Sequence, residues 1–186
     1  MTNFTRKPTL THLAVVPVRL AAYDRPTLLD HFQALDTEDR RLRFGNPLGD
    51  SALRAYVERI DFDGDDVIAV RDERLRIVGA IHVARAGEAA ELGLSVLPGY
   101  RDIGIGTALF ERAVIRVRNR GLASIYIHCL AENAAMMHIA RKLGMRVVRN
   151  GGESDAYLQL GRLKPEALQV LPFGKMDGYR MVESGT

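Results

Sequence analysis

The most constraining feature of this sequence is a loop with spaced glycines that joins an apolar run to a segment with helical periodicity. Apolar side chains alternate over 92–96, Pro98 and Gly99 end this run, and Gly104 and Gly106 open the next segment. The first amides of a helix have no intrahelical acceptor, and the helix dipole places partial positive charge there. The pattern therefore predicts a strand, an anion-binding loop and a helix, in that order.

The spacing of this loop separates it from two other phosphate-binding loops. A P-loop requires Lys and then Ser or Thr after its second glycine, whereas Thr107 and Ala108 follow Gly106 here. A dinucleotide-binding loop requires a third glycine, and Leu109 stands at that position. Arg101 instead supplies a charge that no working pH removes. The remaining alternative is a capped helix that binds nothing.

Composition narrows the class of protein. A chain of 186 residues, 47% hydrophobic and 26% charged, is long enough for one domain with its own core. Cys129 is the single cysteine, so no intrachain disulfide forms and a reducing compartment is expected. With no signal peptide and no membrane-spanning stretch, we expect a soluble cytoplasmic protein without a membrane partner. A net charge of +3 gives no indication of nucleic acid, and the arginines over 112–120 are interpreted as a solvated helix face.

Periodicity and turn residues predict a single mixed α/β domain over 1–162, followed by a partly ordered tail over 163–186. Pro17 places the first strand at an edge, the next three strands form an antiparallel meander, and the fourth and fifth form a parallel pair. Two or more helices separate the first strand from the meander. The expected strands are 13–20, 67–70, 74–84, 89–96, 123–130, 145–149 and 156–160, and helices are expected over 24–35, from 50 or 51 to 60, and over 107–120 and 133–143.

The acidic segment 61–66 is the only stretch that suggests a metal. Counted from Asp61, the twelfth position is Asp72, where a calcium-binding EF-hand loop carries a bidentate Glu. We therefore interpret 61–66 as a solvated turn and predict no metal site.

Two motifs in this order resemble the GNAT superfamily of N-acetyltransferases. The first is Arg-x-x-Gly-x-Gly over 101–106, which resembles the loop that binds the pyrophosphate of acyl-coenzyme A. The second is Asn133 at the end of the next strand, followed by a short helix that closes with Gly144 and Met145. Together the motifs cover roughly 67–160. They imply a single GNAT domain, with an antiparallel N-terminal meander and a parallel central pair flanked by helices.

A shorter resemblance precedes these motifs. Residues 35–44 look like the Leu-Ser-Pro-Glu-x-Arg-x-x-Arg-Phe region found before the GNAT core in bacterial protein-lysine acetyltransferases. This places the chain nearest to single-domain enzymes of that kind.

The resemblance implies acetyl-CoA as the cofactor. Its pyrophosphate is expected on the amides of the loop with Arg101 beside it, and its pantetheine arm along the strand that ends at Val96, whose amide faces the thioester carbonyl. The expected cofactor-binding residues are Leu94, Val96, Arg101, Ile103, Gly104, Ile105, Gly106, Thr107 and Asn133.

Acyl transfer to an amine also needs a base. A lysine-like amine has a pKa of about 10.4 and is protonated at neutral pH. By resemblance the base is Glu91, on the strand face opposite Leu92; a strand-end charge in solvent is the alternative reading, and His82 is the rival base. Many GNAT enzymes carry a Tyr seven residues after the Asn as general acid, and here that position is Ala140. We expect no role for His128, His138 or Cys129.

The sequence thus predicts an acetyl-CoA-dependent N-acetyltransferase that moves an acetyl group directly to a primary amine, either a protein lysine or a small amine. A non-catalytic acyl-CoA sensor or regulatory module is the alternative, and a dinucleotide-binding protein is disfavoured by the loop spacing. The acceptor, the acyl-chain preference and the general acid stay open, and a homodimer is allowed.

Overall fold

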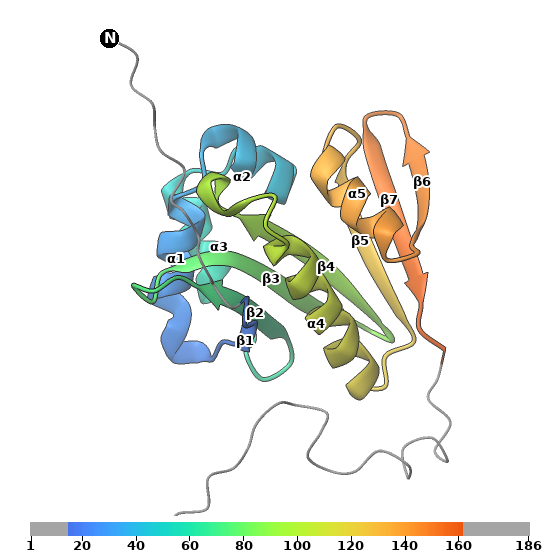
Figure 1. The fold of residues 1–186 in the computed structure, drawn as a ribbon, viewed down its shortest axis with the longest axis horizontal. Coiled ribbons are helices and arrows are strands. Elements are labelled where there is room, and N and C mark those ends of the chain that lie inside the picture. Colours follow the sequence, from blue (N-terminus) through green and yellow to red (C-terminus); the bar gives the residue numbers. More distant parts are fainter. Residues whose placement is uncertain (1–14, 162–186) are drawn as a thin grey trace, which may run out of the picture.

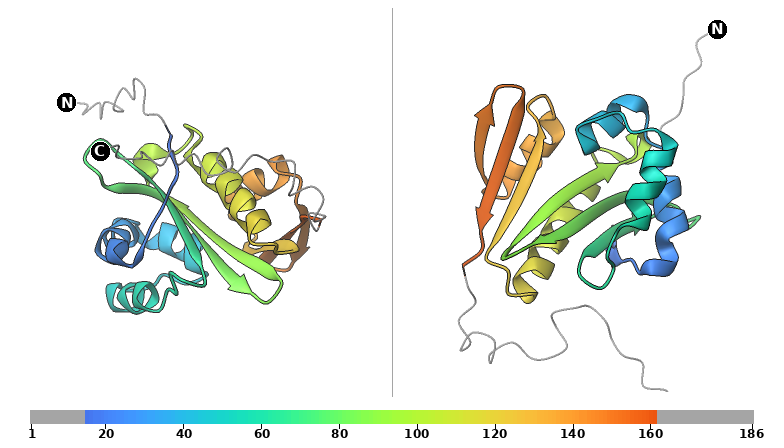
Figure 2. Two further views of the ribbon diagram at one scale, coloured as in Figure 1. Left: turned by 90° about the horizontal axis from the view of Figure 1, so that it is seen from below. Right: turned by 180° about the vertical axis from the view of Figure 1, so that it is seen from behind.

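The structure, a computed structural model, describes residues 15–161 and is built on one seven-stranded sheet. The strand order is β1-β2-β3-β4-β5-β7-β6. Helices α1, α2 and α3 lie on one face and α4 and α5 on the other (Figures 1 and 2). The strands are β1 (Val18–Arg19), β2 (Asp66–Arg71), β3 (Ile77–Ala86), β4 (Ala89–Val96), β5 (Ser124–Leu130), β6 (Arg146–Asn150) and β7 (Glu153–Gln159). The helices are α1 (Arg25–Gln33), α2 (Thr37–Phe44), α3 (Asp50–Glu58), α4 (Ile105–Asn119) and α5 (Ala134–Lys142), with 3-10 turns at Ala22–Asp24 and Pro98–Tyr100.

The mixed α/β fold and the antiparallel meander β2-β3-β4 are confirmed. The first strand lies at the sheet edge as predicted, and residues 13 and 14 of the predicted range lie outside the described residues. Of 15–20, only Val18 and Arg19 pair with β2, after Pro17. Strand β3 begins at Ile77 rather than at 74. The Asp72 carboxylate accepts the Arg74 and Arg76 amides, and this closes a turn before the strand.

Two apolar cores lie on opposite faces of the sheet. On one face, α4 buries Ile105, Leu109, Ala113 and Val117 at helical spacing against β2 to β5. On the other face, α1 and α3 pack a second cluster that includes Phe32 and Leu53. The sheet is therefore covered on both sides at β2 and β3. On the face of β5 and β7 opposite α5, residues 15–161 form no helix (Figure 2).

The parallel pair β4-β5 is confirmed, and it is unusually short. Residues 89–91 of β4 pair with 124–126 of β5, after which no pair forms. On the other side of β4, the Leu97 amide donates to the Val78 carbonyl. This bond shows that the odd-numbered residues of β4 are the ones whose amides point toward β3. Because ladder bonds alternate along an antiparallel strand, the amides of Leu92, Leu94 and Val96 point away from β3. Leu92 directly follows the last pair with β5, whereas the amides of Leu94 and Val96 face the gap that opens between β4 and β5.

The interpretation of 61–66 as a solvated turn is wrong for its last residue. Asp66 has a side chain only 1% exposed and pairs with three arginines from distant elements, Arg19, Arg116 and Arg120. Burial alone raises the pKa of the Asp66 carboxyl, but the hydrogen bonds and charges of these arginines outweigh it and hold the pKa below its usual value. The segment is therefore anchored to the sheet.

The predicted tail over 163–186 lies outside the described residues. Within 15–161, no helix is long and apolar enough to cross a membrane.

Candidate active site

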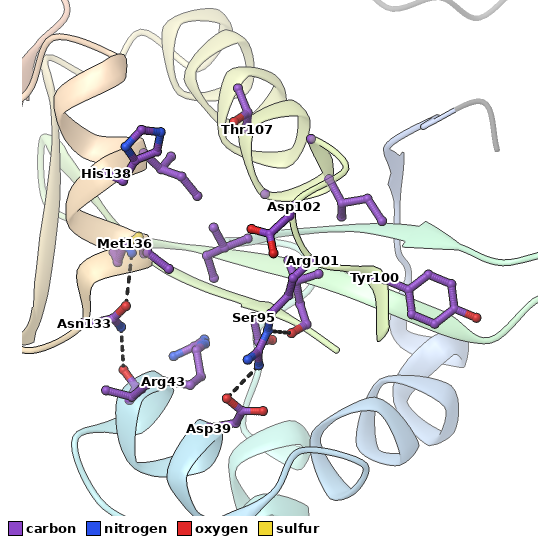
Figure 3. A pocket seen from close by; sticks show the side chains of 18 of the residues that line it. Asp39, Arg43, Ser95, Tyr100, Arg101, Asp102, Thr107, Asn133, Met136 and His138 are labelled. Carbon is purple, nitrogen blue, oxygen red and sulfur yellow. Dashed lines mark hydrogen bonds and ion pairs between the residues drawn. The ribbon is translucent and has the colours of Figure 1, made fainter. Parts of the chain in front are cut away.

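A cavity of about 520 Å³ lies at the gap between β4 and β5. Its walls come from the second half of β4, the loop after it, the first turn of α4, and the facing sides of α5 and α2 (Figure 3). Every predicted cofactor-binding residue except Ile103 lines it. Ile103 is exposed in the loop between Asp102 and Gly104.

The first turn of α4 forms an anion site at one end of this cavity. Gly104 is the N-cap with φ of 90°, a left-handed conformation that favours glycine, and no side chain caps the helix. The first helical bond runs from the Ala108 amide to the Gly104 carbonyl. The amides of 105–107 therefore have no intrahelical acceptor and border the cavity. This arrangement fits a diphosphate group.

Gly106 has a packing role that the sequence does not reveal. A Cβ atom at this position would lie 2.9 Å from Cδ1 of Ile139 in α5, closer than carbon atoms normally approach. The second glycine of the motif thus lets α4 approach α5, whereas Gly104 provides the turn.

Arg101 is held against the end of β4. Its Nε donates to the Val96 carbonyl at 3.0 Å, and its Nη2 pairs with Asp39 Oδ1 at 2.6 Å (Figure 3). Asp39 belongs to α2, and its other oxygen is buried without a hydrogen-bond partner among residues 15–161. The loop is therefore tied to α2 by an ion pair that sequence reasoning missed, at a position where Arg101 still borders the cavity.

Asn133 joins the two helices on either side of the gap. Its Oδ1 accepts the Met136 amide and caps α5, and its Nδ2 donates to the Leu42 carbonyl of α2 at 3.1 Å (Figure 3). The motif asparagine thus has a structural function in addition to its position in the cavity wall. Its partner lies 91 residues away, so the contact has no sequence signal.

Glu91 lies at the closed end of the gap and outside the cavity lining. It is exposed on the face opposite Leu92, as predicted. Tyr126 of β5 is its register partner, and His82 of β3 lies on the same face, paired with Gly93. Burial, followed by the hydrogen bond to Asp155, raises the pKa of the Tyr126 hydroxyl, and the charge of Glu91 adds to this.

His82, the rival base, belongs to a chain of hydrogen bonds. Its Nε2 lies 3.0 Å from Asp65 Oδ2, and its Nδ1 lies 2.7 Å from the Tyr56 hydroxyl, which accepts from Arg43 Nη2 at 3.0 Å. Burial lowers the pKa of His82, a bond from Asp65 partly opposes this, and the charge of Arg43 lowers it further. With His82 neutral, Nε2 donates to Asp65 and Nδ1 accepts from Tyr56, so every group has one consistent role.

Ala140 belongs to α5 and is fully buried in the core on the side of the helix that faces the sheet. At this position α5 presents no hydroxyl to the cavity. Tyr100 does line the cavity, but its hydroxyl donates to Asp72 and accepts from Arg76. Burial raises the pKa of the Tyr100 hydroxyl, so it stays a neutral member of that turn.

The other residues expected to have no role are placed as follows. Cys129 is in the core, where burial raises the pKa of its thiol to about 11 and leaves it a poor nucleophile. His128 is exposed and pairs with Asp155, which raises its pKa. His138 lines the cavity on α5.

The uncapped start of α4 lies beside the edge of β4 that is unpaired within residues 15–161, and the comparisons with known proteins give the class of protein. A sequence profile of the acetyltransferase (GNAT) family matches residues 30–145. The chain belongs to this family, whose members use acetyl-CoA, and it is an acyltransferase.

Solved structures share the fold at low identity. The GNAT domain of S. lividans PAT is 18% identical, with a TM-score of 0.68 over 77% of this chain and 89% of that one. A ribosomal-protein-alanine N-acetyltransferase from Brucella melitensis is 19% identical, with a TM-score of 0.63 over 78% and 99%. A phosphinothricin acetyltransferase from Sinorhizobium meliloti, in complex with AcCoA, is 16% identical, with a TM-score of 0.64 over 86% and 94%.

Proposed function

We propose that the protein is an N-acetyltransferase that moves the acetyl group of acetyl-CoA directly to a primary amine, with Glu91 as the base. The observation that carries the proposal is the continuity of the cavity. It runs from the uncapped first turn of α4 along the strand edge of β4 on which the Leu94 and Val96 amides are unpaired. Beyond the end of this edge lies Glu91.

Different residues of the cavity suit different groups of acetyl-CoA. The amides of 105–107 and the charge of Arg101 suit its diphosphate. The unpaired amides of Leu94 and Val96 suit the amide groups of its pantetheine arm, with apolar walls from Ile139 and Met136. When bound there, acetyl-CoA supplies an acetyl thioester, which is activated toward an amine.

The protein's own contribution to the reaction is to remove a proton from the acceptor amine. An ammonium group is not nucleophilic, so a proton must leave before the amine attacks. Glu91 is exposed on the open face, where an amine can reach it from solvent. His82 is less suited to this role, since both of its nitrogens already bond Asp65 and Tyr56. We assign the proton to Glu91, directly or through a water molecule.

The acceptor is either a protein lysine or a small amine. The resemblance of 35–44 to bacterial protein-lysine acetyltransferases supports the first. A panel of small amines and lysine peptides, incubated with acetyl-CoA, tests the proposal by amine-dependent release of free thiol. The proposal fails if acetyl-CoA binds but no amine increases thiol release above the rate with buffer. That outcome favours the alternative, a non-catalytic acyl-CoA sensor, which the buried Ala140 makes a specific competitor.

A further inference from the structure

Arg43 is a charged side chain at the edge of the cavity that has no charged partner. It is half-buried on α2, and its guanidinium lies 4.6 Å from the ring centre of Phe44, 5.8 Å from that of Tyr56 and 5.9 Å from that of Phe32. Within residues 15–161 it forms no ion pair. Aromatic faces stabilise a cation in part, but they accept no strong hydrogen bond from its N–H groups.

The donors of Arg43 are largely unused. A guanidinium has five N–H groups. One Nη2 bond goes to the Tyr56 hydroxyl at 3.0 Å, and Nε is shielded from solvent without an acceptor in the described part of the chain. The hydrogen-bond chain from Arg43 reaches a carboxylate only at Asp65, after two neutral groups. Moving a charge out of water costs free energy unless a partner compensates it. An anion that residues 15–161 do not supply would therefore stabilise the guanidinium of Arg43.

The position of Arg43 identifies where such an anion would bind. Its guanidinium lies on Gly93 of β4, where an added Cβ atom would overlap Cζ, Nη1 and Nη2. Gly93 lies on the same strand face as Glu91, two residues away, which is about 7 Å along a strand. Arg43 also lines the cavity, at the side where α2 faces β4 (Figure 3). A compact molecule can therefore reach Glu91 and Arg43 at once.

We propose that Arg43 binds a carboxylate of a reactant, and that the acceptor is a compact amine with a carboxylate close to its nitrogen, such as an α-amino acid. The inference rests on the proposed function and specifies its acceptor. Arginine matches a carboxylate with two parallel hydrogen bonds, and Tyr56 fixes the plane of this guanidinium through Nη2. The same carboxylate chemistry exists on the acyl side, in a dicarboxylic acyl thioester, so the experiment needs two arms.

The kinetic experiment compares matched reactants on the full chain. In the first arm, each amino acid is compared with its carboxamide as acceptor, with acetyl-CoA as donor. In the second, succinyl-CoA is compared with acetyl-CoA, with one carboxamide as acceptor. We expect at least a tenfold preference in kcat/KM for the carboxylate in the acceptor arm. A preference in the second arm alone would assign the carboxylate to the acyl group and overturn the acceptor class.

Variants separate binding by Arg43 from a general effect on the protein. Arg43→Gln should abolish the preference by raising KM for the carboxylates, and Arg43→Lys should recover part of it. Arg54→Gln, an exposed arginine of α3, should keep the full preference. Equal kcat/KM within both pairs of reactants in the wild type, which needs no variant to fold, overturns the inference. A uniform fall in kcat for Arg43→Gln with the preference intact does so too.

A binding measurement keeps the inference separate from the reaction. Calorimetric titration of the protein saturated with coenzyme A compares an N-acetyl amino acid with its carboxamide. If no amine is acetylated at all, the proposed function fails, while at least tenfold tighter binding of the carboxylate by wild type than by Arg43→Gln still supports the site. Equal binding of the two compounds overturns it.

Discussion

Two groups of charged side chains differ in how their charge is compensated. The Asp66 carboxylate is only 1% exposed and is surrounded by Arg19, Arg116 and Arg120, all in ion-pair contact with it. Along the β4 edge, Glu91 is exposed and Arg43 has aromatic rings in place of a counter-ion. A compensated charge holds distant elements together, whereas an uncompensated one is available to a ligand. Substitutions in the first group should therefore affect stability, and those in the second should affect function.

The largest expected effect is on turnover. Glu91→Gln removes the proposed base and should lower kcat by about a hundredfold or more, since general base catalysis contributes at least that much. Binding of acetyl-CoA and the free energy of unfolding should stay close to wild type, because the side chain is exposed. Steady-state kinetics and calorimetric titration measure the two. Glu73→Gln, an exposed turn residue, serves as the control, and unchanged turnover in Glu91→Gln would remove this residue from the mechanism.

The next effect is on stability alone. Asp66→Asn leaves three arginines without their shared carboxylate and should lower the free energy of unfolding by about 3 to 5 kcal/mol. Denaturant unfolding measures this, with the exposed Asp63→Asn in the preceding turn as control. At a temperature where the variant is folded, its dissociation constant for acetyl-CoA should match that of wild type. A stable Asp66→Asn variant with impaired cofactor binding would reverse the contrast between the two groups.

The buried neutral side chain of His31 should make the free energy of unfolding depend on pH. His31 Nδ1 donates to the Ile77 carbonyl and Nε2 accepts from Ser95, while burial lowers its pKa from the usual 6.5 to about 4. The unfolded chain therefore binds a proton between these values that the folded chain does not, and stability falls as the pH drops from 6.5 toward 4. The full loss is roughly 3 kcal/mol. Unfolding experiments between pH 4 and 7 should show this slope in wild type and a weaker one in His31→Gln.

The smallest expected effect is on cofactor affinity. Arg101→Ala removes one charge-assisted contact to the diphosphate and should raise the dissociation constant of acetyl-CoA by about tenfold. The main-chain amides of 105–107 keep the rest of the affinity. Because Asp39 then loses its partner, a modest loss of stability should accompany the change. Undiminished affinity in this variant would place Arg101 with the structural charges, as a partner of Asp39 only.

The sequence predicts this fold well where local chemistry decides the structure. The bounds of β4 at Ala89 and Val96 follow from apolar alternation ended by Pro98, whereas α4 begins at Ile105, two residues before the predicted start at 107. The first strand is an exception, because the apolar run over 13–20 does not reveal that, of the described residues before Leu20, only Val18 and Arg19 pair with β2. Local pattern thus locates the cavity and the phosphate loop.

The contacts that complete the site are not local, and the sequence does not predict them. The chain Arg43–Tyr56–His82–Asp65 joins four elements across separations of 13, 26 and 17 residues. The arginines that pair with Asp66 are 47, 50 and 54 residues away from it, so the sequence around 61–66 alone indicates only an acidic turn. Hydrogen-bond partners of this kind depend on strand register and helix placement. The segment 35–44 resembles a region of known enzymes, but the sequence does not show that Arg43 lies on Gly93 of β4.

The central claim is that acetyl-CoA lies along the unpaired edge of β4 with its diphosphate on the first turn of α4. Backbone amide hydrogen exchange, measured residue by residue with and without acetyl-CoA, tests it most directly. Bound acetyl-CoA should slow exchange at Leu94, Val96 and the amides of 105–107, which have no partner among residues 15–161, and leave the Asp66 strand β2 unchanged. Saturation with acetyl-CoA without added protection at these amides would contradict it.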